Sequence, residues 1–121
     1  MPTKTKRQKK QRIDLSSEDI SRLDHILESN ALEDRSSACK FSIHRLVTKL
    51  PERFKKLASR IDQESESDSV GEVSPWGFVC KENVRQEIDT IRYFYAMAHI
   101  SSTIRLAIRV QAATDGWGKT R

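Results

Sequence analysis

The chain has 121 residues, of which 36% are hydrophobic, enough for one small domain but not for an enzyme-sized body around a deep active site. No stretch approaches the ~20 apolar residues that span a bilayer, and the N-terminus lacks the apolar core of a signal peptide. We therefore expect a soluble, cytoplasmic protein. The two cysteines, Cys39 and Cys80, are expected to be reduced thiols rather than a disulfide.

The net charge of +5 is concentrated at the N-terminus. Residues 1–12 hold six basic residues and no acidic one, which leaves 22 − 6 = 16 basic against 17 acidic residues in a nearly neutral remainder. We expect residues 1–9 to be a disordered basic arm that contacts nucleic acid. A tail that binds an acidic protein is the alternative. The candidate phosphate ligands of the arm are Lys4, Lys6, Arg7 and Lys9.

Residues 10–50 are expected to form a strand followed by two helices. In residues 10–15, Ile13 and Leu15 alternate with polar side chains, which indicates a half-buried strand. A helix over 17–29 follows, capped by Ser16 or Ser17. A second helix is expected to be capped by Ser36 or Ser37 and to reach residue 50.

Residues 51–75 are expected to connect two halves of the chain. Pro51 fits the first turn of a helix, and the apolar spacing predicts a short helix over 52–61. Residues 62–75 are acidic and rich in serine, which is typical of a linker.

Residues 76–113 are expected to repeat the order strand, helix, helix. The segment 76–81 reads as a strand, and 83–97 as a helix with apolar residues on one face. After a tight connection at His99, Ser101 is expected to cap a last helix that ends near residue 113. Residues 114–121 form an unassigned tail.

The two halves resemble each other in sequence. Residues 36–43 align with 101–108 at an offset of 65, whereas the apolar faces of the first helices align at 68. The change of offset predicts a connection between the helices that is three residues longer in the first half. One half has no partner for its strand, so two halves are expected to pair their strands and pack four helices beneath them. The expected fold is mostly α with a two-stranded antiparallel β-ribbon, formed within one monomeric chain as one domain.

Two segments carry a family resemblance. The sequence RIDLSSEDISRLD at 12–24 and YAMAHISSTIRLAIR at 95–109 resemble the strand, first helix, turn and second helix of ribbon-helix-helix DNA-binding proteins, in which a glycine often stands at the position of His99. The resemblance implies a pseudo-dimer whose ribbon enters the major groove of double-stranded DNA.

More narrowly, the chain resembles the C-terminal domain of the smaller virulence proteins encoded by the virC operon of Agrobacterium Ti plasmids. The basic arm, the tandem half-motifs and the chain length carry this resemblance. It implies a bacterial protein that promotes T-DNA processing and transfer at overdrive and border DNA, together with relaxosome proteins.

By the family pattern, strand side chains that point away from the core read base edges. On the first strand these are Lys10, Arg12 and Asp14. On the second strand, if Phe78 and Cys80 point inward, the outward positions are Gly77, Val79 and Lys81, of which only Lys81 can read a base through hydrogen bonds, so this half departs from the family pattern. The opposite phase, with Val79 inward, stays open. Arg12 either makes a bidentate contact to guanine or only touches phosphate. The family also binds phosphate at the start of the second helix. The matching residues are Ser36, Ser37, Ser101 and Ser102, which could equally be ordinary helix caps, and the nearby Arg35, Lys40 and Arg105 are expected to reinforce phosphate binding.

No motif indicates catalysis or a cofactor. The histidines and cysteines lack zinc-ligand spacing, and there is no glycine-rich phosphate loop or nucleophile motif, so we expect no enzyme, no metal and no cofactor. Exposed aromatic residues make single-stranded DNA a second partner to consider. Two other functions stay open: a helical protein–protein adaptor with a nonspecific basic arm, and a plasmid repressor or antitoxin of the same fold.

Overall fold

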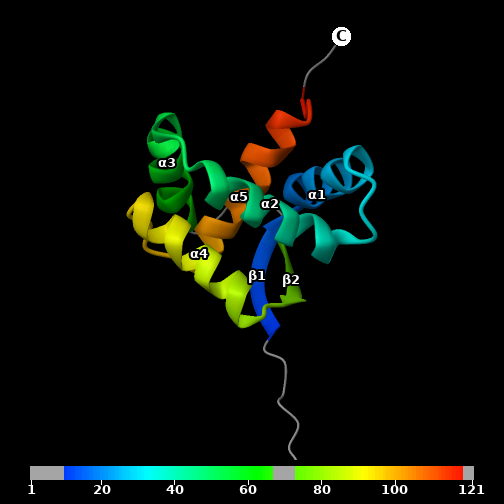
Figure 1. Ribbon diagram of the computed structural model, residues 1–121, viewed down its shortest axis with the longest axis horizontal. Helices are drawn as coiled ribbons and strands as arrows, with labels where there is room; N and C mark the ends of the chain where they lie inside the picture. Colours follow the sequence, from blue (N-terminus) through cyan, green and yellow to red (C-terminus); the bar gives the residue numbers. More distant parts are fainter. Residues whose placement is uncertain (1–9, 67–72, 119–121) are drawn as a thin grey trace, which may run out of the picture.

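The computed structural model describes residues 10–66 and 73–118 (Figure 1). Within them, five α-helices and one 3-10 turn surround a two-stranded antiparallel sheet, as the sequence predicted. The elements, in chain order, are β1 (Lys10–Ser16), α1 (Ser17–Ser29), α2 (Arg35–Lys49), η1 (Glu52–Phe54), α3 (Lys55–Glu66), β2 (Val73–Val79), α4 (Glu82–Phe94) and α5 (Ile100–Thr114). The expected arm at 1–9 lies outside the described residues.

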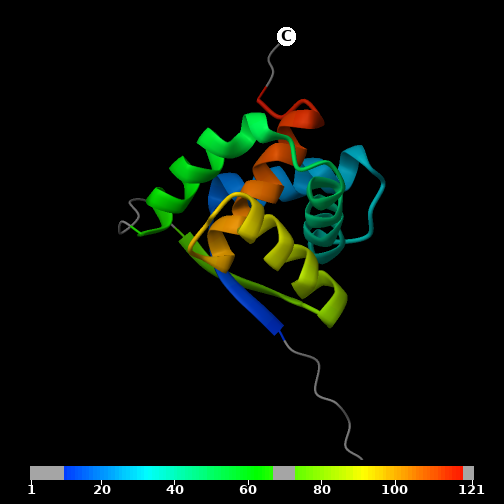
Figure 2. The ribbon, with the colours of Figure 1, turned by 60° about the vertical axis from the view of Figure 1, so that its left-hand side comes forward.

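The ribbon pairs β1 with β2 so that Arg12 faces Gly77 and Lys10 faces Val79. β2 begins and ends earlier than the predicted strand at 76–81, because the chain leaves the ribbon after Val79 and Lys81 is already the N-cap of α4. Figure 2 shows the ribbon along the lower side of the molecule, with the helices on its upper side. The ribbon therefore has one covered and one uncovered face.

The covered face of the ribbon carries the apolar side chains. Ile13, Leu15 and Phe78 are at most 5% exposed and belong to one continuous core with the helices. Cys80, just beyond the strand, is also buried, so the phase with Phe78 and Cys80 inward is confirmed. Trp76 lies on the same face, stacked on Phe78 with ring centroids 5.6 Å apart.

In the first half of the chain, α1 matches the prediction more closely than α2 does. α1 has the predicted bounds, and its N-cap is Ser16, whose Oγ accepts a hydrogen bond from the Asp19 N–H at 3.1 Å. α2 is not capped by Ser36 or Ser37, because Asp34 takes this position and its carboxylate accepts the Ser37 N–H at 2.9 Å. An aspartate is as good an N-cap as a serine, so sequence spacing alone did not separate them.

The predicted short helix at 52–61 consists of the 3-10 turn η1 and the helix α3, which runs on to Glu66. The prediction that the linker begins at residue 62 is therefore wrong by five residues, because residues 62–66 belong to α3. Residues 62–66 contain no proline or glycine, and Asp62 is held by contacts to the connection before α5, so the helix continues.

The second-half helices begin and end differently from the prediction. α4 ends at Phe94 rather than at 97, because Ala96 takes the left-handed backbone conformation with φ 53°. The Met97 N–H then donates to the Arg92 carbonyl at 2.9 Å, which closes the helix end. α5 begins at Ile100 with His99 as its N-cap, so Ser101 lies inside the first turn.

The helices of the two halves begin at one constant offset, which corrects the prediction of two. Ser17 and Glu82 begin α1 and α4, and Arg35 and Ile100 begin α2 and α5; 82 − 17 and 100 − 35 are both 65. Paired helices have equal lengths of 13 and 15 residues. The connection in the first half is therefore not longer. The offset of 68 had aligned the partly buried Ile20 with the buried Ile88.

The residues after α5 pack against α1. His25 Nε2 lies 2.8 Å from the Asp115 carbonyl oxygen, and the Trp117 ring meets the His25 ring edge-on with centroids 5.9 Å apart. Residues 115–118 of the predicted tail are thus part of the fold. Among the described residues, no helix is both long and apolar enough to cross a membrane.

Candidate nucleic-acid interface

Three exposed polar side chains line β1 on the uncovered face of the ribbon. Lys10, Arg12 and Asp14 alternate with the buried residues of the strand, so all three point away from the core. A lysine, an arginine and a carboxylate offer hydrogen-bond donors and an acceptor in one row, the groups that read base edges in the major groove. These three predicted residues share one face.

The β2 side of this face is nearly bare. Its outward positions, paired with those of β1, are Pro75, Gly77 and Val79. None of them has a side chain that can form a hydrogen bond. The alternation of residues in 76–81 predicted that the second strand would have fewer polar side chains than β1 on this face. The structure makes the difference larger, because Lys81 lies beyond the strand, exposed at the start of α4.

Gly77 makes room for the basic side chains of the opposite strand. A Cβ atom at position 77 would lie 3.1 Å from the Gln11 carbonyl oxygen, 3.4 Å from Cγ of Arg12 and 3.7 Å from Cδ of Lys10. The stems of Arg12 and Lys10 therefore pass across β2 at the glycine. Sequence reasoning treated Gly77 only as an empty outward position and did not find this role.

Arg105 supports the ribbon from the helical side. Its guanidinium donates from Nη2 and Nε to the backbone carbonyl oxygen of Asp14, at 2.9 Å and 3.3 Å. Arg105 was predicted to reinforce phosphate binding at the start of α5. The structure shows it in contact with the end of β1, where the strand turns into α1. Its role toward phosphate stays a prediction.

The N-terminus of α2 is capped by a carboxylate from the residue that precedes it. Asp34 caps the helix, and its hydrogen bond from Ser37 lowers the pKa of the Asp34 carboxyl. Arg35 donates from Nε and Nη2 to the two carboxylate oxygens of Asp24, at 2.8 Å and 3.0 Å, which lowers the pKa of Asp24. Ser36 and Ser37 are half-buried, and Lys40 lies one turn further along the helix.

The start of α5 is covered by a carboxylate from α3. Asp62 accepts the Ala98 N–H at 3.1 Å and 3.2 Å and lies 3.3 Å from His99 Nδ1. Burial raises the pKa of Asp62, but the hydrogen bonds from Ala98, His99 and Ser102 outweigh burial and lower it. Ser102 is buried and Ser101 half-buried, and the Asp62 carboxylate lies beside the two residues that precede the helix.

A buried carboxylate joins the two halves of the chain. Asp19 on α1 is 1% exposed and accepts hydrogen bonds from Arg22 at 2.8 Å and from Arg109 of α5 at 3.1 Å and 3.3 Å. On the other side of the molecule, His44 of α2 lies 2.7 Å from a carboxylate oxygen of Glu87 on α4. Each second helix is thus tied to the first helix of the opposite half.

Both thiols are buried and free, as expected. Burial raises the pKa of both Cys39 and Cys80, so neither is an activated nucleophile. In the described part of the chain, no three His, Cys, Asp or Glu side chains gather as metal ligands. Of the predicted phosphate ligands, Lys4, Lys6, Arg7 and Lys9 lie outside the described residues.

Comparison of the chain with protein-family models, with curated proteins and with solved structures found no match.

Proposed function

We propose that the chain is a non-enzymatic DNA-binding module with a ribbon-helix-helix architecture, in which residues 10–49 and 73–114 form the two halves of a pseudo-dimer. The constant offset of 65 residues supports this reading, because Arg12 and Gly77 are 65 positions apart and also face each other across the ribbon. Two equivalent residues that face each other across an antiparallel ribbon are what a twofold axis through that ribbon requires.

The DNA contact of this proposal is the uncovered face of β1. Lys10 and Arg12 are exposed, have their stems aligned across Gly77, and form no ion pair with a described residue. A two-stranded ribbon fits the major groove, where an arginine can bind guanine O6 and N7 together. This exposed, positively charged row above a buried core is the single observation that carries the proposal.

Readout is expected to be asymmetric and of modest specificity. Among the residues of β2 whose side chains the structure describes, the outer side carries Pro75, Gly77 and Val79, so this half of the ribbon offers apolar contact and no side-chain hydrogen bond. The sequence-independent share of the affinity then comes from phosphate contacts by basic residues such as Lys40 and Lys81 and by the N-terminal arm, and should fall with salt.

The resemblance to the virC-operon proteins extends the proposal to a biological role. It supports an accessory function in T-DNA processing and transfer, with relaxosome proteins as partners and overdrive or border DNA as the target. Because both strands of the ribbon come from one chain, we propose a monomer as the acting form. Sedimentation that shows an obligate dimer would contradict this form.

A mobility-shift assay at two salt concentrations tests the ribbon. The comparison uses the wild type, Arg12→Ala, the matched control Arg60→Ala on the exposed surface of α3, and a chain without residues 1–9. We expect Arg12→Ala to weaken binding by about tenfold or more, a loss of ~1–3 kcal/mol, and Arg60→Ala to have little effect. If only removal of residues 1–9 abolishes binding and Arg12→Ala changes nothing, the basic arm alone binds DNA and the ribbon does not.

A further inference from the structure

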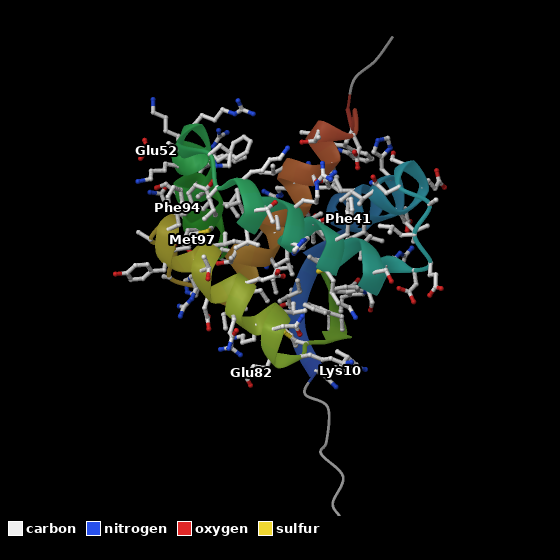
Figure 3. The ribbon with its side chains drawn as sticks, in the orientation of Figure 1. Lys10, Phe41, Glu52, Glu82, Phe94 and Met97 are labelled. Carbon is white, nitrogen blue, oxygen red and sulfur yellow. The ribbon has the colours of Figure 1, made fainter. Side chains whose placement is uncertain are left out.

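A second positively charged surface lies far from the ribbon. A pocket of about 170 Å³ opens between the C-terminal parts of α2 and α5 and the turn η1. Figure 3 labels Glu52 of η1 and Lys10 of β1 at opposite ends of the molecule. A ligand in this pocket therefore does not compete for space with DNA on the ribbon.

The pocket is lined by cations without acidic neighbours. Arg45, Lys49 and Arg53 line it, and no aspartate or glutamate is among the residues of its wall. None of the three forms an ion pair with a residue whose side chain the structure describes. Residues 40–60 as a whole contain seven basic residues and one acidic residue. The near-neutral total for the chain after residue 12 thus hides a strongly positive region.

The two guanidinium groups of the pocket lie against aromatic rings. Arg45 sits over Phe41 at 5.5 Å from the ring centroid, and Arg53 sits over Phe54 at 5.1 Å. These contacts fix the side chains at low entropic cost, and a guanidinium plane held in this way can stack against a nucleobase on its other side. The rest of the wall is mixed, with Leu46, Pro51, Phe54 and Val110 as apolar members and Gln111 and Thr114 as polar ones.

We propose that this pocket is a second nucleic-acid site, which binds single-stranded DNA through its phosphates and one partly inserted base. The three cations match a run of phosphodiester groups, and the apolar wall with its stacked arginines matches a base face. Duplex DNA presents a convex, charged backbone and keeps its base faces stacked inside, so it fits a concave, half-apolar pocket poorly. The site does not depend on the ribbon, and one chain would hold a duplex and a single strand at opposite ends.

Fluorescence anisotropy with a labelled 12-nucleotide oligothymidine at about 150 mM salt tests the proposal on the full chain. The test variant carries Arg45→Gln, Lys49→Gln and Arg53→Gln together. The matched control carries Lys56→Gln, Arg60→Gln and Arg85→Gln, which remove the same charge from exposed positions outside the pocket. We expect the test variant to lose about tenfold or more in affinity for the oligonucleotide and the control to lose less than about threefold.

Two further arms separate this site from other ligands and from the ribbon. An unlabelled duplex of equal length and a poly-glutamate peptide should displace the oligonucleotide from the pocket much less well than unlabelled oligothymidine does. Equal losses in the two triple variants, or displacement by poly-glutamate as effective as by oligothymidine, would overturn the proposal. Arg12→Ala should weaken duplex binding and leave oligonucleotide binding unchanged. If it leaves both unchanged while the pocket variant loses the oligonucleotide, the ribbon function fails and the pocket site stands.

Discussion

Arg12 and Gly77 face each other across the ribbon, and the arginine stem lies in the space that a side chain at position 77 would fill. The pairing places an exposed arginine over β2, whose described outward residues have no side chain that can hydrogen-bond to a base. The geometry of the arginine therefore depends on the absence of a side chain on the opposite strand.

Gly77→Val tests this dependence. Valine favours strands, so the ribbon should still form, but its side chain would displace the stems of Arg12 and Lys10. We expect duplex affinity to fall by roughly tenfold, about the effect of removing one good base contact. Ser74→Val, on the same strand but the other face, is the control. A variant that keeps its circular dichroism spectrum and its full DNA affinity would show that Arg12 needs no such space.

Asp19 should be among the most sensitive polar positions for stability. Its buried carboxylate lies between Arg22 and Arg109, so Asp19→Asn removes the negative charge that both partly buried guanidinium groups contact. We expect a loss of about 2–4 kcal/mol in the free energy of unfolding, measured by urea denaturation. Glu18→Gln, one residue away and largely exposed, should change it by less than about 0.5 kcal/mol. Equal effects of the two substitutions would mean that the two arginines find other partners.

Asp62 should make stability depend on acidic pH. Its pKa in the folded chain lies below the ordinary value of 3.8, so the carboxylate stabilises the fold fully above that value, and the contribution disappears as the pH falls through the folded pKa. Asp62→Asn should cost about 1 kcal/mol at pH 7. The difference from the wild type should shrink below about pH 4. Urea denaturation at pH 7 and pH 3 measures both values, and a pH-independent difference would show that the charge of Asp62 is not what holds α5.

The ends of α1 and α4 offer two stabilising substitutions. Ala31 and Ala96 have φ angles of 54° and 53°, a conformation that costs an alanine but not a glycine about 1 kcal/mol. Ala31→Gly and Ala96→Gly should therefore each raise the free energy of unfolding by roughly 0.5–1 kcal/mol. Ala113→Gly, inside α5 and exposed, should lower it by about 1 kcal/mol. Thermal unfolding of the three variants checks the signs, and a loss at 31 or 96 would contradict the backbone geometry.

The sequence predicted the elements better than their caps and partners. Alternation in 10–15 and helical spacing in 17–29 are local signals, and both gave the bounds within a residue. The cap of α2 was misplaced because Asp34 and Ser36 are equally suitable for that position. The contacts of Asp62 and Arg105 were not visible in the sequence. Asp62 binds a residue 36 positions away, and Arg105 binds one 91 positions away.

The candidate site was predictable only on one strand. The phase of β1 follows from its own alternation, so Lys10, Arg12 and Asp14 could be placed outward from the sequence. The phase of β2 could not be predicted from the sequence, because Phe78 and Val79 are both apolar. Which of the two side chains faces the core is decided by the pairing with β1 and by the packing of the helices. The basic pocket beside Arg45 was hidden because its cations come from the helix α2 and the turn η1, and its wall is completed only by the packing of α5 against them.

The central claim is that duplex DNA binds the uncovered face of the ribbon, and backbone amide shifts measured by NMR during titration with a 20-base-pair duplex test it most directly. We predict that the largest shifts fall on Lys10, Arg12 and Asp14 of β1 and on Gly77 of β2, while the amides of α3 change little. Shifts confined to other elements, with those of the ribbon unchanged, would contradict the claim.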